Sequence, residues 1–67
     1  MSVGKVIEIT ASSGKSFEKA IEKGIERAHK TVKNVRGAWV KEMKVAVTDG
    51  QITEYRVNMQ VTFLLDD

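Results

Sequence analysis

Side chains suited to chemistry are few in this sequence. It contains one His (His29), one Trp (Trp39) and no Cys. An isolated His provides neither a multi-His zinc site nor a nucleophile–base pair, and the lack of Cys excludes thiolate ligands and thiolate nucleophiles. We therefore expect no catalytic residues, no metal site of this kind and no enzymatic activity.

Trp39 and Arg56 are the strongest candidates for contact with a ligand. The ring of Trp39 is suited to stacking on a planar molecule, and equally to anchoring a core or a subunit interface. Arg56 donates several hydrogen bonds but accepts none, which suits carbonyl or phosphate oxygens. It belongs to a polar series at alternate positions, which either is solvated or lines a cavity or an interface. The residues alone leave these alternatives open.

Carboxylates are the other group able to bind a ligand. Calcium takes roughly six to eight oxygen ligands, and the acidic residues do not follow the spacing of an EF-hand loop. A calcium site would therefore form only where several subunits bring their acids together. The acids considered are Glu8, Asp49, Glu54, Asp66 and Asp67.

Length and charge limit the fold and the partners. With 67 residues the chain is expected to be one domain, residues 1–67, whose core is too thin to stabilise it alone. Disulfides are absent, so self-association is the expected stabiliser. Eleven basic and nine acidic residues give a net charge of +2, which is too small for a nucleic-acid-binding surface. No apolar stretch has the length of a signal peptide or a membrane span, and we expect a cytoplasmic protein.

One amphipathic helix is predicted in the first half of the chain. From Phe17 onward apolar residues recur every three or four positions as far as Val35, and charged residues occupy the opposite face. Ser13 or Ser16 provides an N-cap, and Gly37 provides a stop.

Gly24 interrupts the apolar stripe of this helix. A glycine inside a helix costs about 1 kcal/mol relative to Ala. We expect Gly24 to allow close packing rather than to take part in chemistry.

Three strands are predicted around the helix. Alternation of apolar and polar residues marks 3–10, 38–48 and 52–65. Asp49 and Gly50 join the last two strands, because both residue types tolerate the positive φ of a tight hairpin turn. The expected fold class is α+β, a β-α-β-β chain whose three-stranded antiparallel sheet packs against one helix.

The last predicted strand is longer than the diameter expected for the folded chain. Fully extended, residues 52–65 span about 46 Å at about 3.3 Å per residue. A compact globule of this chain length has a diameter of about 28 Å. We expect the ends of the strand to project and to pair with neighbouring copies.

Six local segments share one pattern with a known family. They are Lys5–Ile9, Ser12–Ser13, Ala28–Val32, Trp39–Glu42, Tyr55–Val57 and Val61–Leu65. Together with the chain length and the element order, they resemble the dodecins, small β-α-β-β proteins that assemble into hollow homododecamers and in many members bind flavins. The resemblance covers nearly the whole chain.

The resemblance also implies where a ligand binds. Flavin-binding dodecins stack the isoalloxazine ring on a Trp just after the helix and hydrogen-bond its edge through a Gln on the third strand. Counted back from Val61, those two positions hold Gly37 and Arg56 here, and Trp39 lies two residues after Gly37. Two positions along a strand keep the same face, at a displacement of roughly 6 to 7 Å. The pattern also resembles a second dodecin group that lacks the stacking Trp and is linked to calcium.

The function implied by the resemblance is small-molecule binding and storage. The leading hypothesis is a homododecamer that sequesters a flavin (riboflavin, FMN or FAD) at subunit interfaces, with Trp39, Arg56 and Gly37 at the site. The alternatives are a flavin-free dodecin that binds calcium or another small ligand, and a purely structural oligomer. Neither nucleic acid nor a membrane is expected as a partner.

Overall fold

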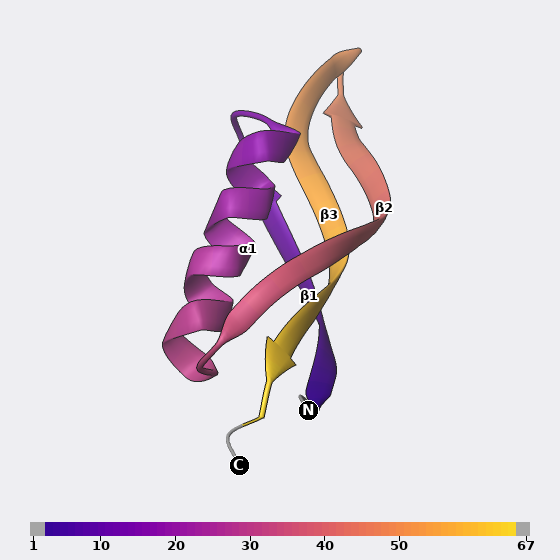
Figure 1. Ribbon diagram of the computed structural model, residues 1–67. Coiled ribbons are helices and arrows are strands. Elements are labelled where there is room, and N and C mark those ends of the chain that lie inside the picture. The colour runs from indigo at the N-terminus through magenta and orange to yellow at the C-terminus, as the bar shows by residue number, and fades with distance from the viewer. Residues whose placement is uncertain (1–2, 66–67) are drawn as a thin grey trace.

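The computed structural model describes residues 3–65 and has the expected α+β architecture (Figure 1). One helix covers one face of a three-stranded sheet whose order is β1-β3-β2, and both pairs of neighbouring strands are antiparallel. No helix in the described part of the chain is long and apolar enough to cross a membrane. The elements are β1 (Gly4–Ser13), α1 (Phe17–Thr31), β2 (Val35–Thr48) and β3 (Gln51–Leu64).

The helix begins where the sequence predicts and ends earlier. Ser16 is the N-cap, and its hydroxyl oxygen accepts a hydrogen bond from the backbone N–H of Lys19 at 3.0 Å. The prediction that Gly37 stops the helix is wrong, because α1 ends at Thr31 and Gly37 lies inside β2. Asn34 adopts the left-handed backbone conformation (φ 61°) that reverses the chain, which Asn tolerates better than most residues.

The first strand is longer than its sequence pattern indicates. The prediction ends it at residue 10, but β1 continues to Ser13. Ala11, Ser12 and Ser13 pair in register with β3, whose length provides backbone hydrogen-bonding partners for them. Pairing with a long neighbour therefore outweighs the weak strand preference of these small residues.

The β2–β3 hairpin confirms the predicted turn and the excess length of the last strand. Asp49 and Gly50 have φ of 52° and 76°, as a two-residue turn of this type requires. The molecule measures 52 × 19 × 13 Å, and the hairpin end of the sheet extends past the helix in Figure 1. Its large apolar side chains are exposed on this projecting arm. They are Met43, Val45, Val47 and Ile52.

The core lies between α1 and alternate residues of β3. The buried strand residues Val57, Met59 and Val61 pack against Ala20 and Ala28 of the helix. Because these helix residues are small, the helix approaches the sheet closely, and the side chains of β3 fill most of the core.

Two further contacts support the predicted packing. Phe17 and Tyr55 meet edge to face, with ring centroids 5.1 Å apart, at the start of the helix. A Cβ added to Gly24 would lie 2.6 Å from Cε of Met59 and 3.1 Å from Cβ of Ala11. The interpretation of Gly24 as a close-packing residue is therefore confirmed.

Candidate functional site

The sheet face that α1 does not cover is largely polar, and we call it the helix-free face. It is formed by the β3 residues that alternate with the core residues, together with their direct cross-strand partners on β1 and β2. The β3 residues of this face are Glu54, Arg56, Asn58, Gln60 and Thr62.

Trp39 lies on this face beside an amide. It pairs directly with Gln60, which pairs on its other side with Glu8. Direct cross-strand partners have Cβ atoms about 5 Å apart. Trp39 is 63% exposed, so its ring makes little contact with the core of its own chain.

Gly37 lies on the same face as Trp39, two residues before it in β2. It pairs with Thr62, the neighbour of Gln60 on this face. A Cβ built at Gly37 meets no atom within 4 Å. The space next to Trp39 is therefore open.

Arg56 shares the face but lies away from Trp39. It pairs with Lys44 on one side and Ser12 on the other, and its guanidinium forms an ion pair with Glu54. Gln60 lies four positions further along β3, which corresponds to about 13 Å. Within one chain, the structure does not bring Trp39 and Arg56 together.

A β-bulge next to Trp39 increases the number of side chains on the helix-free face. The pairing register shifts between Val40 and Glu42, which leaves Lys41 as the extra residue of β2. Lys41 reaches over β3, and its Nζ lies 3.5 Å from Oε1 of Glu8. The side chains of Trp39, Lys41 and Glu42 therefore all lie on the helix-free face. Bulges commonly redirect side chains in this way next to binding sites.

Asn58 links two carboxylates at the centre of this face. Its Nδ2 donates to Oε2 of Glu8 at 3.1 Å and to Oε1 of Glu42 at 3.4 Å. Hydrogen bonding from Asn58, the charge of Lys41 and a further hydrogen bond from Gln60 lower the pKa of Glu8. The Oδ1 atom of Asn58 is buried and has no hydrogen-bond partner within residues 3–65.

The other acids considered from the sequence do not join this cluster. Asp49 lies in the hairpin turn and Glu54 pairs with Arg56, whereas Asp66 and Asp67 lie outside the described residues. In the described part of the chain, no three His, Cys, Asp or Glu side chains gather in a way that would hold a metal ion.

Sequence reasoning missed the polar neighbours of Trp39. Gln60 and Asn58 belong to the polar series that the sequence predicts for β3, but only the strand register and the bulge bring them, with Lys41, close to Trp39. The one usable signal was the alternation along β3, which places Gln60 and Asn58 on the face opposite the core.

Comparison with known proteins identifies the family. The family model described as Dodecin matches residues 3–66. The chain belongs to the dodecin family. It is 31% identical over 65 residues to the dodecin of Thermus thermophilus, which covers 97% of this chain and 94% of that one. The solved dodecin structure from Streptomyces davaonensis superposes with a TM-score of 0.93 at 35% identity, covering 98% of this chain and 97% of that one.

A calcium dodecin is also among the relatives. The calcium dodecin of Mycobacterium tuberculosis is 38% identical over 63 residues, covering 94% of this chain and 89% of its own. A solved structure of calcium dodecin from that organism, described as having a novel calcium-binding site, has a TM-score of 0.82. It covers 97% of this chain and 93% of that one. Dodecins similar to this chain thus include one named for calcium.

Proposed function

We propose that this dodecin binds and stores a flavin (riboflavin, FMN or FAD) by stacking the isoalloxazine ring on Trp39. The observation that carries the proposal is the position of Trp39, 63% exposed on the helix-free face beside Gln60. An aromatic ring so exposed adds little to the core of its own chain. Covering it with a planar ligand removes a large apolar surface from water.

The neighbours of Trp39 complete this site. Gly37 leaves room for a ring wider than the indole, since no atom lies within 4 Å of a Cβ at that position. Gln60 supplies an amide that both donates and accepts hydrogen bonds, as the edge of a flavin requires.

Arg56 contributes to the same site from a neighbouring copy. It lies about 13 Å from Gln60 along β3, and its guanidinium is paired with Glu54 of its own chain, so the proposal assigns it to a ring stacked on the Trp39 of an adjacent chain. Its guanidinium suits the carbonyl oxygens of the ring or the phosphate of FMN. The site is thus formed at a subunit interface.

The same proposal includes a cytoplasmic homo-oligomer, a dodecamer as in the family pattern. The projecting arm with its exposed Met43, Val45, Val47 and Ile52 supports self-association, because a monomer would leave these side chains in water. Static light scattering tests this part separately: a dodecamer has twelve times the mass of the chain, whereas a monomeric mass would contradict it.

Titration of riboflavin with the purified protein tests the flavin proposal. Stacking on Trp39 brings indole and isoalloxazine into contact, so we expect saturable quenching of flavin fluorescence at micromolar protein. Unchanged flavin fluorescence throughout the titration would contradict the proposal.

Calcium binding is the second candidate function. Glu8 and Glu42 both accept hydrogen bonds from Asn58, so two carboxylates and an amide face one another. If the side-chain amide of Asn58 rotated by half a turn, its Oδ1 would replace Nδ2 beside the two carboxylates. Asn58 would then add an oxygen ligand of the type that calcium prefers. The calcium dodecin relative supports this alternative.

Calorimetric titration with calcium distinguishes the two functions. Binding heat in the unmodified protein that is lost in Glu42→Gln favours calcium. Absence of binding heat, together with quenching of riboflavin fluorescence, favours flavin. If neither ligand binds, a purely structural oligomer is favoured.

A further inference from the structure

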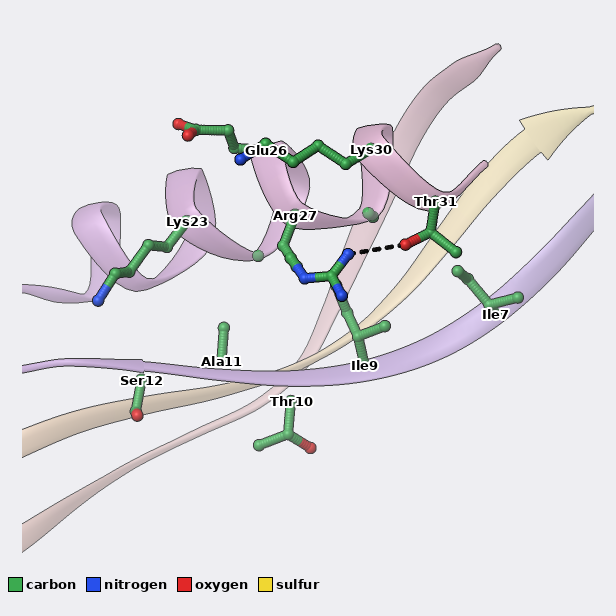
Figure 2. Close-up of a pocket in the computed structure, with 12 residues that line it drawn as sticks. Ile7, Ile9, Thr10, Ala11, Ser12, Lys23, Glu26, Arg27, Lys30 and Thr31 are labelled. Carbon is green, nitrogen blue, oxygen red and sulfur yellow. Dashed lines mark hydrogen bonds between the residues drawn. The ribbon is translucent and has the colours of Figure 1, made fainter. Parts of the chain in front are cut away.

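A groove on the other side of the sheet lies between α1 and β1, away from the helix-free face (Figure 2). Its volume is about 610 Å³, within the range of roughly 300 to 1,000 Å³ that is usual for small-molecule sites. The groove is open because β1 is an edge strand, so no further strand extends the sheet beyond it. Backbone N–H and C=O groups along such an edge are available to a ligand.

The floor of the groove is aliphatic. Ile7, Ile9 and Ala11 face the helix from β1, and Gly24 and Ala28 face them from α1. The residues that line the groove include no aromatic side chain. The floor therefore suits a flexible aliphatic chain better than a planar ring that needs a stacking partner.

The rim of the groove is basic. Lys23, Arg27 and Lys30 line it together with one acid, Glu26. No carboxylate in residues 3–65 lies within ion-pairing distance of these three cations. Three cations against one acid give the rim a net positive charge that the described chain does not neutralise.

Arg27 is the residue of this rim that reaches toward the strand. Figure 2 shows its side chain extending from the helix toward Ile9. Its Nη1 donates to Oγ1 of Thr31 at 2.8 Å, which orients the guanidinium. The remaining N–H groups are left to bind a carboxylate in a bidentate manner.

We propose that this groove binds a single-chain amphiphile with a carboxylate head, of the medium-chain fatty-acid type. The carboxylate pairs with Arg27, and the chain lies along Ile7, Ile9 and Ala11. Complementary charge at the rim and aliphatic surface at the floor both point to this class of ligand. The site is separate from the proposed flavin site, which lies on the opposite face of the sheet.

Calorimetric titration of the intact protein with dodecanoate tests the proposal. We expect saturable binding of one molecule per chain, no saturable binding of dodecyltrimethylammonium, and an affinity for dodecanoate at least roughly tenfold lower in Arg27→Gln. Lys33→Gln is the matched control, because Lys33 is exposed and does not line the groove; it should bind as the unmodified protein does.

Three outcomes would overturn the proposal. Absence of dodecanoate binding excludes the site, and equal binding of the cationic amphiphile shows that the charged rim does not select the ligand. A change of assembly mass in Arg27→Gln, seen by light scattering, would show that a second copy of the chain covers the groove. None of these outcomes depends on riboflavin binding.

Discussion

Trp39 of β2 and Gln60 of β3 are direct cross-strand partners on the helix-free face, although 20 residues lie between them in the sequence. The pairing places an exposed indole beside an amide, at about the 5 Å typical of such pairs. Gln60 also hydrogen-bonds to Glu8, which accepts further hydrogen bonds and lies opposite the ammonium of Lys41. In the proposed flavin site, this network would orient the amide of Gln60 toward a ring stacked on Trp39.

Replacement of Gln60 should weaken flavin binding without removing the stacking platform. Gln60→Leu keeps the approximate shape of the side chain and eliminates its hydrogen bonds, so the riboflavin Kd should rise roughly tenfold. Fluorescence titration measures this change. Glu22→Leu, at an exposed position of α1 away from the helix-free face, is the control and should leave Kd unchanged. An unaltered Kd in Gln60→Leu would remove Gln60 from the site.

The assignment of Arg56 to a neighbouring copy predicts complementation. Trp39→Ala and Arg56→Ala should each weaken riboflavin binding roughly tenfold or more when assembled alone. Co-assembled chains of the two variants should recover part of the quenching, because some interfaces then combine an intact Trp39 from one chain with an intact Arg56 from its neighbour. If the two residues acted within one chain, the mixture would bind no better than the separate variants.

The lowered pKa of Glu8 predicts an acid-dependent contribution to stability. Because the folded pKa lies below the ordinary value of 4.5, the ionised carboxylate stabilises the fold above pH 4.5. This contribution is lost as the pH falls from 4.5 through the lowered folded pKa. Urea unfolding should therefore show Glu8→Gln to be less stable than the unmodified chain near about pH 7, with the difference shrinking near about pH 3. A difference that does not vary with pH would contradict this role of the carboxylate.

Several features of the fold could be predicted from the sequence because they depend on neighbours in the chain. The cap at Ser16 and the turn at Asp49 and Gly50 are set by local hydrogen bonding and backbone preference. The inner face of β3 follows from strict alternation, and its residues Val57 and Met59 are fully buried.

The arrangement of the candidate site could not be predicted, because it depends on which residues the strands bring opposite one another. The bulge at Lys41 has no marker such as Gly in the local sequence, yet it brings Lys41 within reach of Glu8. Gln60 became a partner of Trp39 only once the register was known. The predicted stop at Gly37 failed for a related reason, since Asn34 reverses the chain and Gly37 pairs within the sheet.

Gly24 gives a test of the core that is independent of any ligand. Gly24→Ala gains about 1 kcal/mol in helix propensity but forces Met59 and Ala11 to move in a closely packed region. Overpacking of this kind costs about 1 to 3 kcal/mol, so the variant should be less stable by up to about 2 kcal/mol in urea unfolding. Gly14→Ala is the control, since a Cβ at Gly14 meets no atom within 4 Å. A Gly24→Ala variant more stable than the unmodified protein would contradict the close-packing role.

The most direct test of the flavin proposal is a paired riboflavin titration of the unmodified protein and of Trp39→Ala, with Lys33→Ala as the control. Lys33 is also exposed, but it lies in the connection between α1 and β2, away from the helix-free face and from the projecting arm. We predict saturable quenching of flavin fluorescence by the unmodified protein and by Lys33→Ala, and its loss in Trp39→Ala. Equal quenching by all three proteins, or by none, would contradict a flavin site built on Trp39.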